Sequence, residues 1–138
     1  MILGALLFTI FLALSLLHLS WALGSAWGFE NSLPTTEDGT RILNPKKIDC
    51  AVVGGGLLLF AIFYLIKADL ISFALPEIVM KAASWVIPII FLFRAVGDFK
   101  YVGFFKKVTS TSFAKRDSSF YSPLCLGIGV IAILTEFA

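Results

Sequence analysis

The sequence predicts an all-α protein, a polytopic membrane four-helix bundle with an amphipathic basic cytoplasmic loop between the third and fourth helices. Of its 138 residues 59% are hydrophobic and 14% are charged, whereas a soluble domain is about half apolar and roughly a quarter charged. The apolar residues fall into four runs, and one membrane crossing takes about 20 residues. We therefore expect a single transmembrane domain over residues 1–138, with helices at about 2–27, 49–66, 76–96 and 119–137.

The first predicted helix, residues 2–27, carries no charged side chain. A secretory signal peptide is the competing interpretation, because Ala22, Gly24 and Ala26 are small residues near its end. No Lys or Arg precedes the apolar run, and the run is longer than the roughly 7–15 apolar residues of a signal peptide. The pattern favours a membrane helix.

The second predicted helix, residues 49–66, contains Cys50 and the run Gly54-Gly55-Gly56. Small residues let a neighbouring backbone approach closely, which matters in a membrane because water supplies no driving force for helix association there. We expect this face to pack against another helix, with a homo-oligomer through it as one outcome. The alternative is a flexible or ligand-contacting segment.

Prolines mark the starts of the other two helices. Pro76 precedes the third helix, in which Pro88 is expected to introduce a kink. Ser122 followed by Pro123 predicts an N-cap and a first helical position for the fourth helix. That helix is short unless residues 118–121 also join it.

The distribution of cations predicts an orientation. In a four-span protein loops 28–48 and 97–118 lie on one side, and only two of the eleven Lys and Arg residues, Lys67 and Lys81, fall on the other. Cytoplasmic loops carry an excess of Lys and Arg. We therefore expect both loops in the cytoplasm and both termini outside.

The segment from residue 94 to residue 125 holds the expected site. Arg94 and Asp98 stand at i and i+4, where they can pair. An ionised group at that depth is costly unless it is paired or faces water, so the pair is a candidate functional site, or else a structural ion pair that closes the bundle. The following hydroxyls and cations suit a phosphate or sulfate group, or anionic lipid in general. The expected anion-binding cations are Arg94, Lys106, Lys107, Lys115 and Arg116.

Three other polar residues lie in the predicted membrane helices. His18, the only histidine, shares a helix face with Trp21. Such a histidine can be a proton relay, a haem ligand or a catalytic base, although a neutral ring hydrogen-bonded across the bundle is the commoner state. Cys50 and Cys125 fall at similar depth, which permits a redox pair, but they lack the C-x-x-C spacing and also fit as two small packing residues.

Several strings are specific in combination: His18-Leu-Ser-Trp21-Ala22, Arg94-Ala-Val-Gly97-Asp98-Phe99, Gly103-Phe104-Phe105-Lys106 and Tyr121-Ser122-Pro123-Leu124-Cys125. Together they resemble a family of small bacterial four-span membrane proteins, DUF3995-like, catalogued only as a domain of unknown function. The resemblance implies a four-helix protein of the bacterial cytoplasmic membrane. It brings no activity, cofactor or catalytic residue with it.

The sequence favours binding or transport of an amphipathic anionic ligand, lipid-like or phosphate-bearing, at the cytoplasmic leaflet. The five cations and Asp98 would hold its head, with His18, Trp21 and Tyr121 nearby. One alternative is a membrane-embedded enzyme acting on a lipid, quinone or isoprenoid, with His18 as base; another is a helical partner subunit without its own ligand. The net charge of +2 gives no basis for nucleic acid, no metal-ligand spacing occurs, and the expected partners are membrane lipids.

Overall fold

The computed structural model describes residues 1–138 as an all-helical chain, which confirms the predicted fold class. Three of its four long helices are single α-helices, and the fourth begins with a short α-helix and a π-helical turn. All four are long and apolar enough to cross a membrane. The elements are α1 (Ile2–Ala22), η1 (Glu30–Ser32), α2 (Lys47–Lys67), α3 (Glu77–Val96), α4 (Ser112–Arg116), η2 (Asp117–Tyr121) and α5 (Ser122–Leu134).

The first helix ends at Ala22, so the expectation that it extends to residue 27 is wrong. Gly24 adopts a φ of +105°, a conformation that residues with a side chain rarely adopt and that terminates a helix. The indole Nε1–H of Trp21 then donates to the carbonyl of Trp27 over 2.7 Å. This bond folds the chain back over the end of α1.

The fourth span begins earlier than expected, and the assignment of Ser122 as its N-cap is wrong. Thr111 is the N-cap, because its hydroxyl accepts from the backbone N–H of Ala114 over 3.0 Å. Ser122 has helical dihedrals of −69° and −43°. Pro123 is the second residue of α5, one residue after the π-helical turn η2, where the wider hydrogen-bonding pattern tolerates a residue without an N–H.

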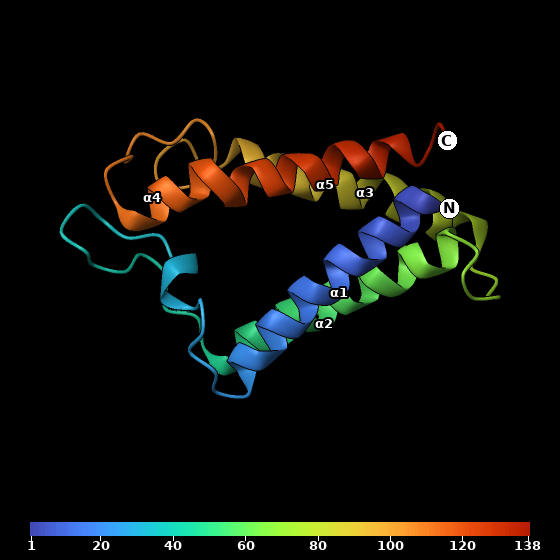
Figure 1. The fold of residues 1–138 in the computed structure, drawn as a ribbon, viewed down its shortest axis with the longest axis horizontal. Coiled ribbons are helices and arrows are strands. Elements are labelled where there is room, and N and C mark those ends of the chain that lie inside the picture. Colours follow the sequence, from blue (N-terminus) through green and yellow to red (C-terminus); the bar gives the residue numbers. More distant parts are fainter.

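The helices pack as two pairs. α1 lies along α2 and α3 lies along α5, and the pairs converge at the end that holds both termini and diverge toward the other end (Figure 1). Gly54 brings α1 and α2 together: an added Cβ would lie 2.8 Å from the Leu19 side chain, and the Ser15 hydroxyl donates to the Gly54 carbonyl over 2.7 Å. Gly55 has no neighbour within 4 Å, so the expected close packing within the chain falls on one glycine of the three.

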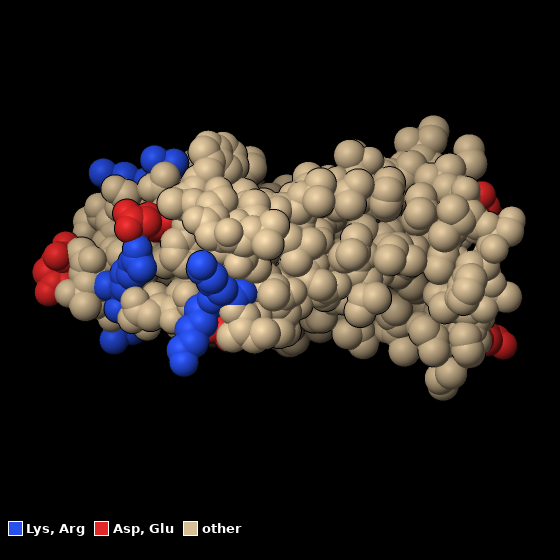
Figure 2. Space-filling view, turned by 90° about the horizontal axis from the view of Figure 1, so that it is seen from below, with Lys and Arg blue, Asp and Glu red and all other residues tan.

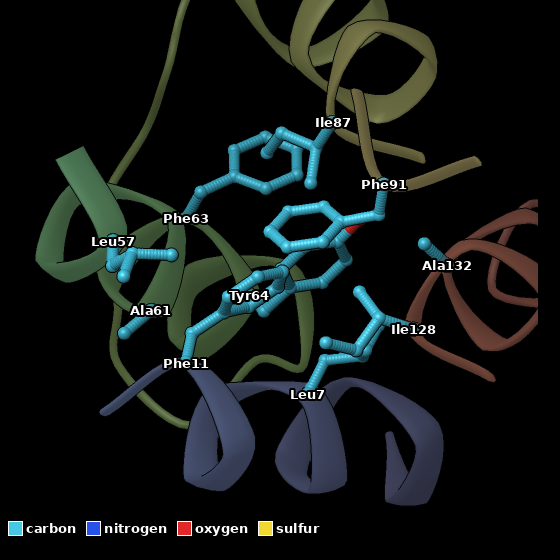
Figure 3. Packing of buried hydrophobic residues seen from close by; sticks show 10 residues of the cluster. All are labelled: Leu7, Phe11, Leu57, Ala61, Phe63, Tyr64, Ile87, Phe91, Ile128 and Ala132. Carbon is cyan, nitrogen blue, oxygen red and sulfur yellow. The ribbon is translucent and has the colours of Figure 1, made fainter. Parts of the chain in front are cut away.

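The hydrophobic core lies where the pairs converge. Phe11 of α1 is fully buried and stacks on Tyr64 of α2, with 5.7 Å between the ring centroids. All four long helices contribute side chains to this cluster (Figure 3). Its members are Leu7, Phe11, Leu57, Ala61, Phe63, Tyr64, Ile87, Phe91, Ile128 and Ala132.

Both long loops, residues 23–46 and 97–111, lie at the diverging end, which we call the loop end (Figure 1). The face in Figure 2 carries Lys and Arg side chains at this end, whereas the middle of the molecule shows no charged residue. Many large apolar side chains are exposed along the helices, for example Val52, Leu59 and Phe93. An apolar belt over helices of this length suits a hydrocarbon solvent.

Candidate functional site

A cavity of about 620 Å³ opens between the two helix pairs toward the loop end. Its volume is within the range of small-molecule sites, roughly 300–1,000 Å³. The walls are mostly hydrophobic and come from all four spans, with Leu14, Leu57, Phe91 and Ile128 as examples. The ionisable or hydrogen-bonding side chains among the lining residues are His18, Trp21, Ser32, Asp49, Cys50, Arg94, Tyr121 and Cys125.

An ion cluster of Arg94, Lys106 and Asp117 borders this cavity. Asp117 is fully buried, and its Oδ1 accepts from Arg94 Nη2 over 2.8 Å. Its Oδ2 accepts from Lys106 Nζ over 3.1 Å and from the Gly103 backbone N–H over 2.7 Å. One carboxylate therefore faces two cations, so the cluster keeps a net charge of +1.

The loop after α3 is folded to build this cluster. Gly97 and Gly103 have φ values of +87° and +91°, and a Cβ on Gly103 would lie 2.3 Å from the Val96 carbonyl oxygen. The backbone N–H of Phe104 donates to the Ala95 carbonyl over 2.8 Å. These two glycines allow the loop to turn back on the end of α3, which aims the Gly103 N–H at Asp117.

One nitrogen of the Arg94 guanidinium makes no hydrogen bond. Its Nη2 is used by Asp117, but its Nη1 is buried without a hydrogen-bond partner. Arg94 also lines the apolar cavity. A guanidinium edge that is desolvated and unpaired is costly, and an anionic group in the cavity would remove that cost.

The expected pairing of Arg94 with Asp98 is wrong. Gly97 ends the helix, so Asp98 lies beyond it and is exposed. Its Oδ1 accepts from the backbone N–H groups of Lys100, Tyr101 and Val102 over 2.8–3.0 Å. Partial burial acts to raise the pKa of Asp98, but these three donors hold that pKa below its usual range. Asp98 shapes the loop and does not neutralise Arg94.

The other predicted cations do not line the cavity. Lys106 is buried, and its ammonium group donates to the Gly103 carbonyl, Asp117 and the Ser118 hydroxyl over 2.9, 3.1 and 2.5 Å. Three bonds use all three of its N–H groups. Lys107, Lys115 and Arg116 are exposed on the surface of the loop end. The structure thus keeps Lys106 beside Arg94 on the shared carboxylate of Asp117 and separates both from Lys107, Lys115 and Arg116.

His18, Trp21 and Tyr121 do line the cavity together with Arg94. His18 Nδ1 lies 2.8 Å from the Leu14 carbonyl, which can only accept, so Nδ1 carries a proton and Nε2 is free of any hydrogen bond. The imidazole stands edge-on to Trp21 with 4.7 Å between the ring centroids. The Tyr121 hydroxyl donates to the Asn31 carbonyl over 3.0 Å and so connects η2 to the first loop.

Sequence reasoning missed two features. Asp117 falls in the predicted loop 97–118, outside the expected helix 119–137, so its position in the sequence did not indicate that it would be buried between Arg94 and Lys106. The second is an ion pair at the opposite end, where Lys67 Nζ lies 2.6 Å from Glu136 and donates to the Ser84 hydroxyl over 2.8 Å. In a four-span protein the second and fourth spans end on the same side. The sequence could therefore have indicated that Lys67 and Glu136 lie near each other.

The two cysteines are free thiols on opposite walls of the cavity. Cys50 belongs to α2 and is buried, and Cys125 belongs to α5 and is half-buried. Both side chains add to the apolar lining beside Arg94.

Comparison with known proteins identifies one family. A family model described as "Protein of unknown function (DUF3995)" matches residues 11–132. This segment includes the cavity residues and the whole Arg94–Lys106–Asp117 cluster. No curated protein and no solved structure matches the chain.

Proposed function

The chain belongs to the DUF3995 family, and we propose that it binds or transports an amphipathic anionic ligand, lipid-like or phosphate-bearing, in the cavity between its helix pairs. The apolar chain of the ligand lies among the hydrophobic walls. Its anionic head lies at the loop end against Arg94.

The unpaired Nη1 of Arg94 carries this proposal. Arg94 lines a mostly apolar cavity while its Nη1 is covered and has no partner, so a small rotation of the guanidinium would offer that nitrogen to a molecule with one charged end and an apolar body. Asp117 and Lys106 hold the other side of Arg94 and leave a net positive charge. A bidentate bond from guanidinium to carboxylate or phosphate is among the stronger hydrogen-bonding arrangements in proteins.

We place the head of the ligand at the cytoplasmic leaflet. Nine of the eleven Lys and Arg residues belong to the loop end, since only Lys67 and Lys81 lie at the other. Positive loops stay in the cytoplasm. The exposed Lys107, Lys115 and Arg116 then attract anionic molecules toward the membrane surface, and Arg94 binds the one that enters.

A binding measurement in lipid nanodiscs tests the proposal. The probe is a fluorescent alkyl phosphate added to the wild type, to Arg94→Gln and to Arg116→Gln. Loss of a charge-assisted hydrogen bond costs about 1.5–3 kcal/mol, so Arg94→Gln should weaken binding at least tenfold. Arg116→Gln removes an exposed cation of the same end and should change the Kd by less than about twofold.

An uncharged control completes the experiment. The alcohol of the same alkyl chain should bind the wild type and Arg94→Gln equally weakly. Equal phosphate affinity of the wild type and Arg94→Gln would refute the proposal, as would equal affinity of the phosphate and the alcohol for the wild type.

An enzymatic role is the second candidate, and His18 favours it. The Nε2 of His18 makes no hydrogen bond, and His18 lines the same cavity as Arg94, so the neutral ring would suit a general base. A lipid, quinone or isoprenoid bound by Arg94 would then be the substrate. Conversion of a bound amphiphile by the wild type but not by His18→Gln, with unchanged binding, would support this role over binding alone.

A further inference from the structure

A second apolar surface continues the cavity along the same two helices. This groove of about 350 Å³ lies between α2 and α3, and all its lining residues are hydrophobic. α2 packs mainly on α1 and α3 on α5, so no helix covers the groove. Its lining residues are Leu59, Phe60, Ile62, Phe63, Ile66, Leu75, Val79, Ala83, Val86 and Ile87.

The cavity and the groove occupy successive halves of the α2–α3 gap. On α2 the cavity takes residues 49–60 and the groove residues 59–66; on α3 the cavity takes residues 90–94 and the groove residues 79–87. Phe60 lines both. Its ring packs on Phe11 and Phe91, with centroids 5.7 and 6.4 Å away, and it marks the junction.

We infer that the cavity and the groove are one binding seam for a single-chain anionic amphiphile whose chain passes Phe60 and lies along the groove to Val79. The inference rests on the proposed function, because Arg94 fixes the head. Val79 lies about four turns from Arg94, roughly 22 Å along α3. The hydrocarbon core of a bilayer is about 30 Å thick, so an acyl chain of one leaflet reaches only about half that depth.

The length of the seam thus selects a class of ligand. A chain that follows it from Arg94 to Val79 must lie extended over about 22 Å, deeper than the disordered acyl chains of one leaflet reach, so the seam suits a single chain, saturated or isoprenoid, that is held straight. The groove carries no charged residue, so it accepts only hydrocarbon. The tail of the ligand lies in hydrocarbon whether it is bound or free in the bilayer. The groove therefore selects among tails by packing and shape rather than by removing them from water.

Photo-crosslinking in nanodiscs tests the seam. Two pairs of probes, alkyl phosphates and alkyl carboxylates, carry a diazirine at the chain end and have either a short chain of about 6 Å or a long chain of about 22 Å, the span of the seam. The long probes should label residues 62–66 and 79–83, and the short ones residues 53–57 and 90–91. Labelling by both should fall at least fivefold in Arg94→Gln. The head that labels more strongly indicates a phosphate or a carboxylate ligand.

Two variants fill the seam at different points. Phe60→Trp narrows the junction and Ala83→Trp fills the groove, so each should reduce long-probe labelling at residues 79–83 at least fivefold. Ala83 does not line the cavity, so Ala83→Trp should leave short-probe labelling unchanged. Ile89→Trp is the control, because Ile89 is exposed and lines neither space. It should leave both labelling patterns unchanged.

The outcomes separate this inference from the proposed function. If short probes label the cavity in an Arg94-dependent way while long probes label only exposed residues such as Ile89, the seam is refuted and the proposed function stands. Long-probe labelling that is unchanged in both tryptophan variants also refutes the seam. If no probe depends on Arg94, the proposed function fails with it.

Discussion

The two ends of the bundle both hold ion pairs, but the pairs differ in burial and in how many cations share each acid. At the end with the termini, Lys67 is bonded to Glu136 and Ser84, and the aromatic core begins directly beside them. At the loop end Arg94 and Lys106 share the single acid Asp117, the helices diverge, and Arg94 Nη1 has no partner. Lys67 has an acid of its own and helps to close its end, whereas Arg94 shares its acid with a second cation, lines the cavity and keeps one nitrogen without a partner.

The difference follows from the chain connections. The termini end needs only the nine-residue link 68–76 between α2 and α3, so the pairs can converge there. The loop end must accommodate residues 97–111, which fold onto α3 and bring Gly103 and Lys106 to Asp117. The fold therefore places its aromatic core at one end and its cavity, bordered by the ion cluster, at the other.

The largest expected effect comes from removing the acid shared by two cations. Asp117→Asn keeps the shape of the side chain but leaves Arg94 and Lys106 without a counter-ion. Breaking a buried pair in this way costs about 3–5 kcal/mol, which should appear as a large drop in the free energy of unfolding measured by SDS titration in mixed micelles.

Asp98→Asn is the matched control. Asp98 is exposed, and an amide oxygen can still accept its backbone bonds, so the loss should remain below about 1 kcal/mol. If the two variants unfold at the same SDS fraction, Asp117 is not the centre of the cluster.

The second effect concerns the turn that brings the loop to Asp117. Gly103→Ala forces a side chain into φ +91° and against the Val96 carbonyl oxygen. The left-handed conformation alone costs roughly 1–2 kcal/mol, and the clash adds to it, so we expect a loss of at least about 2 kcal/mol. The same unfolding titration measures it.

Gly55→Ala provides the comparison. Gly55 is helical with no neighbour within 4 Å, and alanine there should stabilise α2 by about 0.5–1 kcal/mol. Opposite signs for the two glycine variants are expected. A neutral Gly103→Ala would show that the loop can reach Asp117 by another path.

The third effect tests the termini end. Lys67→Met leaves Glu136 about one-fifth exposed and without its cation; since solvent reaches the pair, we expect a loss of only about 1–2 kcal/mol. The double variant Lys67→Met with Glu136→Leu should recover part of it. Binding of an anionic amphiphile should be unchanged in both. A tenfold loss of binding would contradict the division between the two ends.

The four-helix fold was predictable because it depends on composition and run length. Four apolar segments predicted the four long helices. The start of α3 directly after Pro76 and the close helix packing at Gly54 were also expected. The early end of α1 and the early start of the fourth span were not predictable from hydropathy. They depend on the hydrogen bond from Trp21 to Trp27 and on a π-helical turn before Pro123. The length of an apolar run does not predict either feature.

The grouping of the candidate residues was predicted in part, whereas their role in binding stays a prediction. Arg94, His18, Trp21 and Tyr121 lie on one cavity as polar residues in an apolar chain suggested. The choice of Asp98 over Asp117 was wrong because i,i+4 spacing assumes that the helix continues, whereas Gly97 ends it. Contacts between residues 94, 106 and 117 depend on how the loop folds, which spacing along the sequence does not reveal.

The smallest effect concerns the wall formed by α1 and α2. Ser15 is fully buried and donates to the Gly54 carbonyl, so Ser15→Ala removes one interhelical bond, worth about 0.6 kcal/mol on average in a membrane. Ser20→Ala, whose hydroxyl bonds Leu17 within its own helix, should cost less in the same titration. A loss above about 2 kcal/mol for Ser15→Ala would mean that the hydrogen bond, rather than close packing at Gly54, holds this wall together. In that case the cavity would depend on a polar contact midway along the bundle, and the contrast between the two ends would no longer explain where it opens.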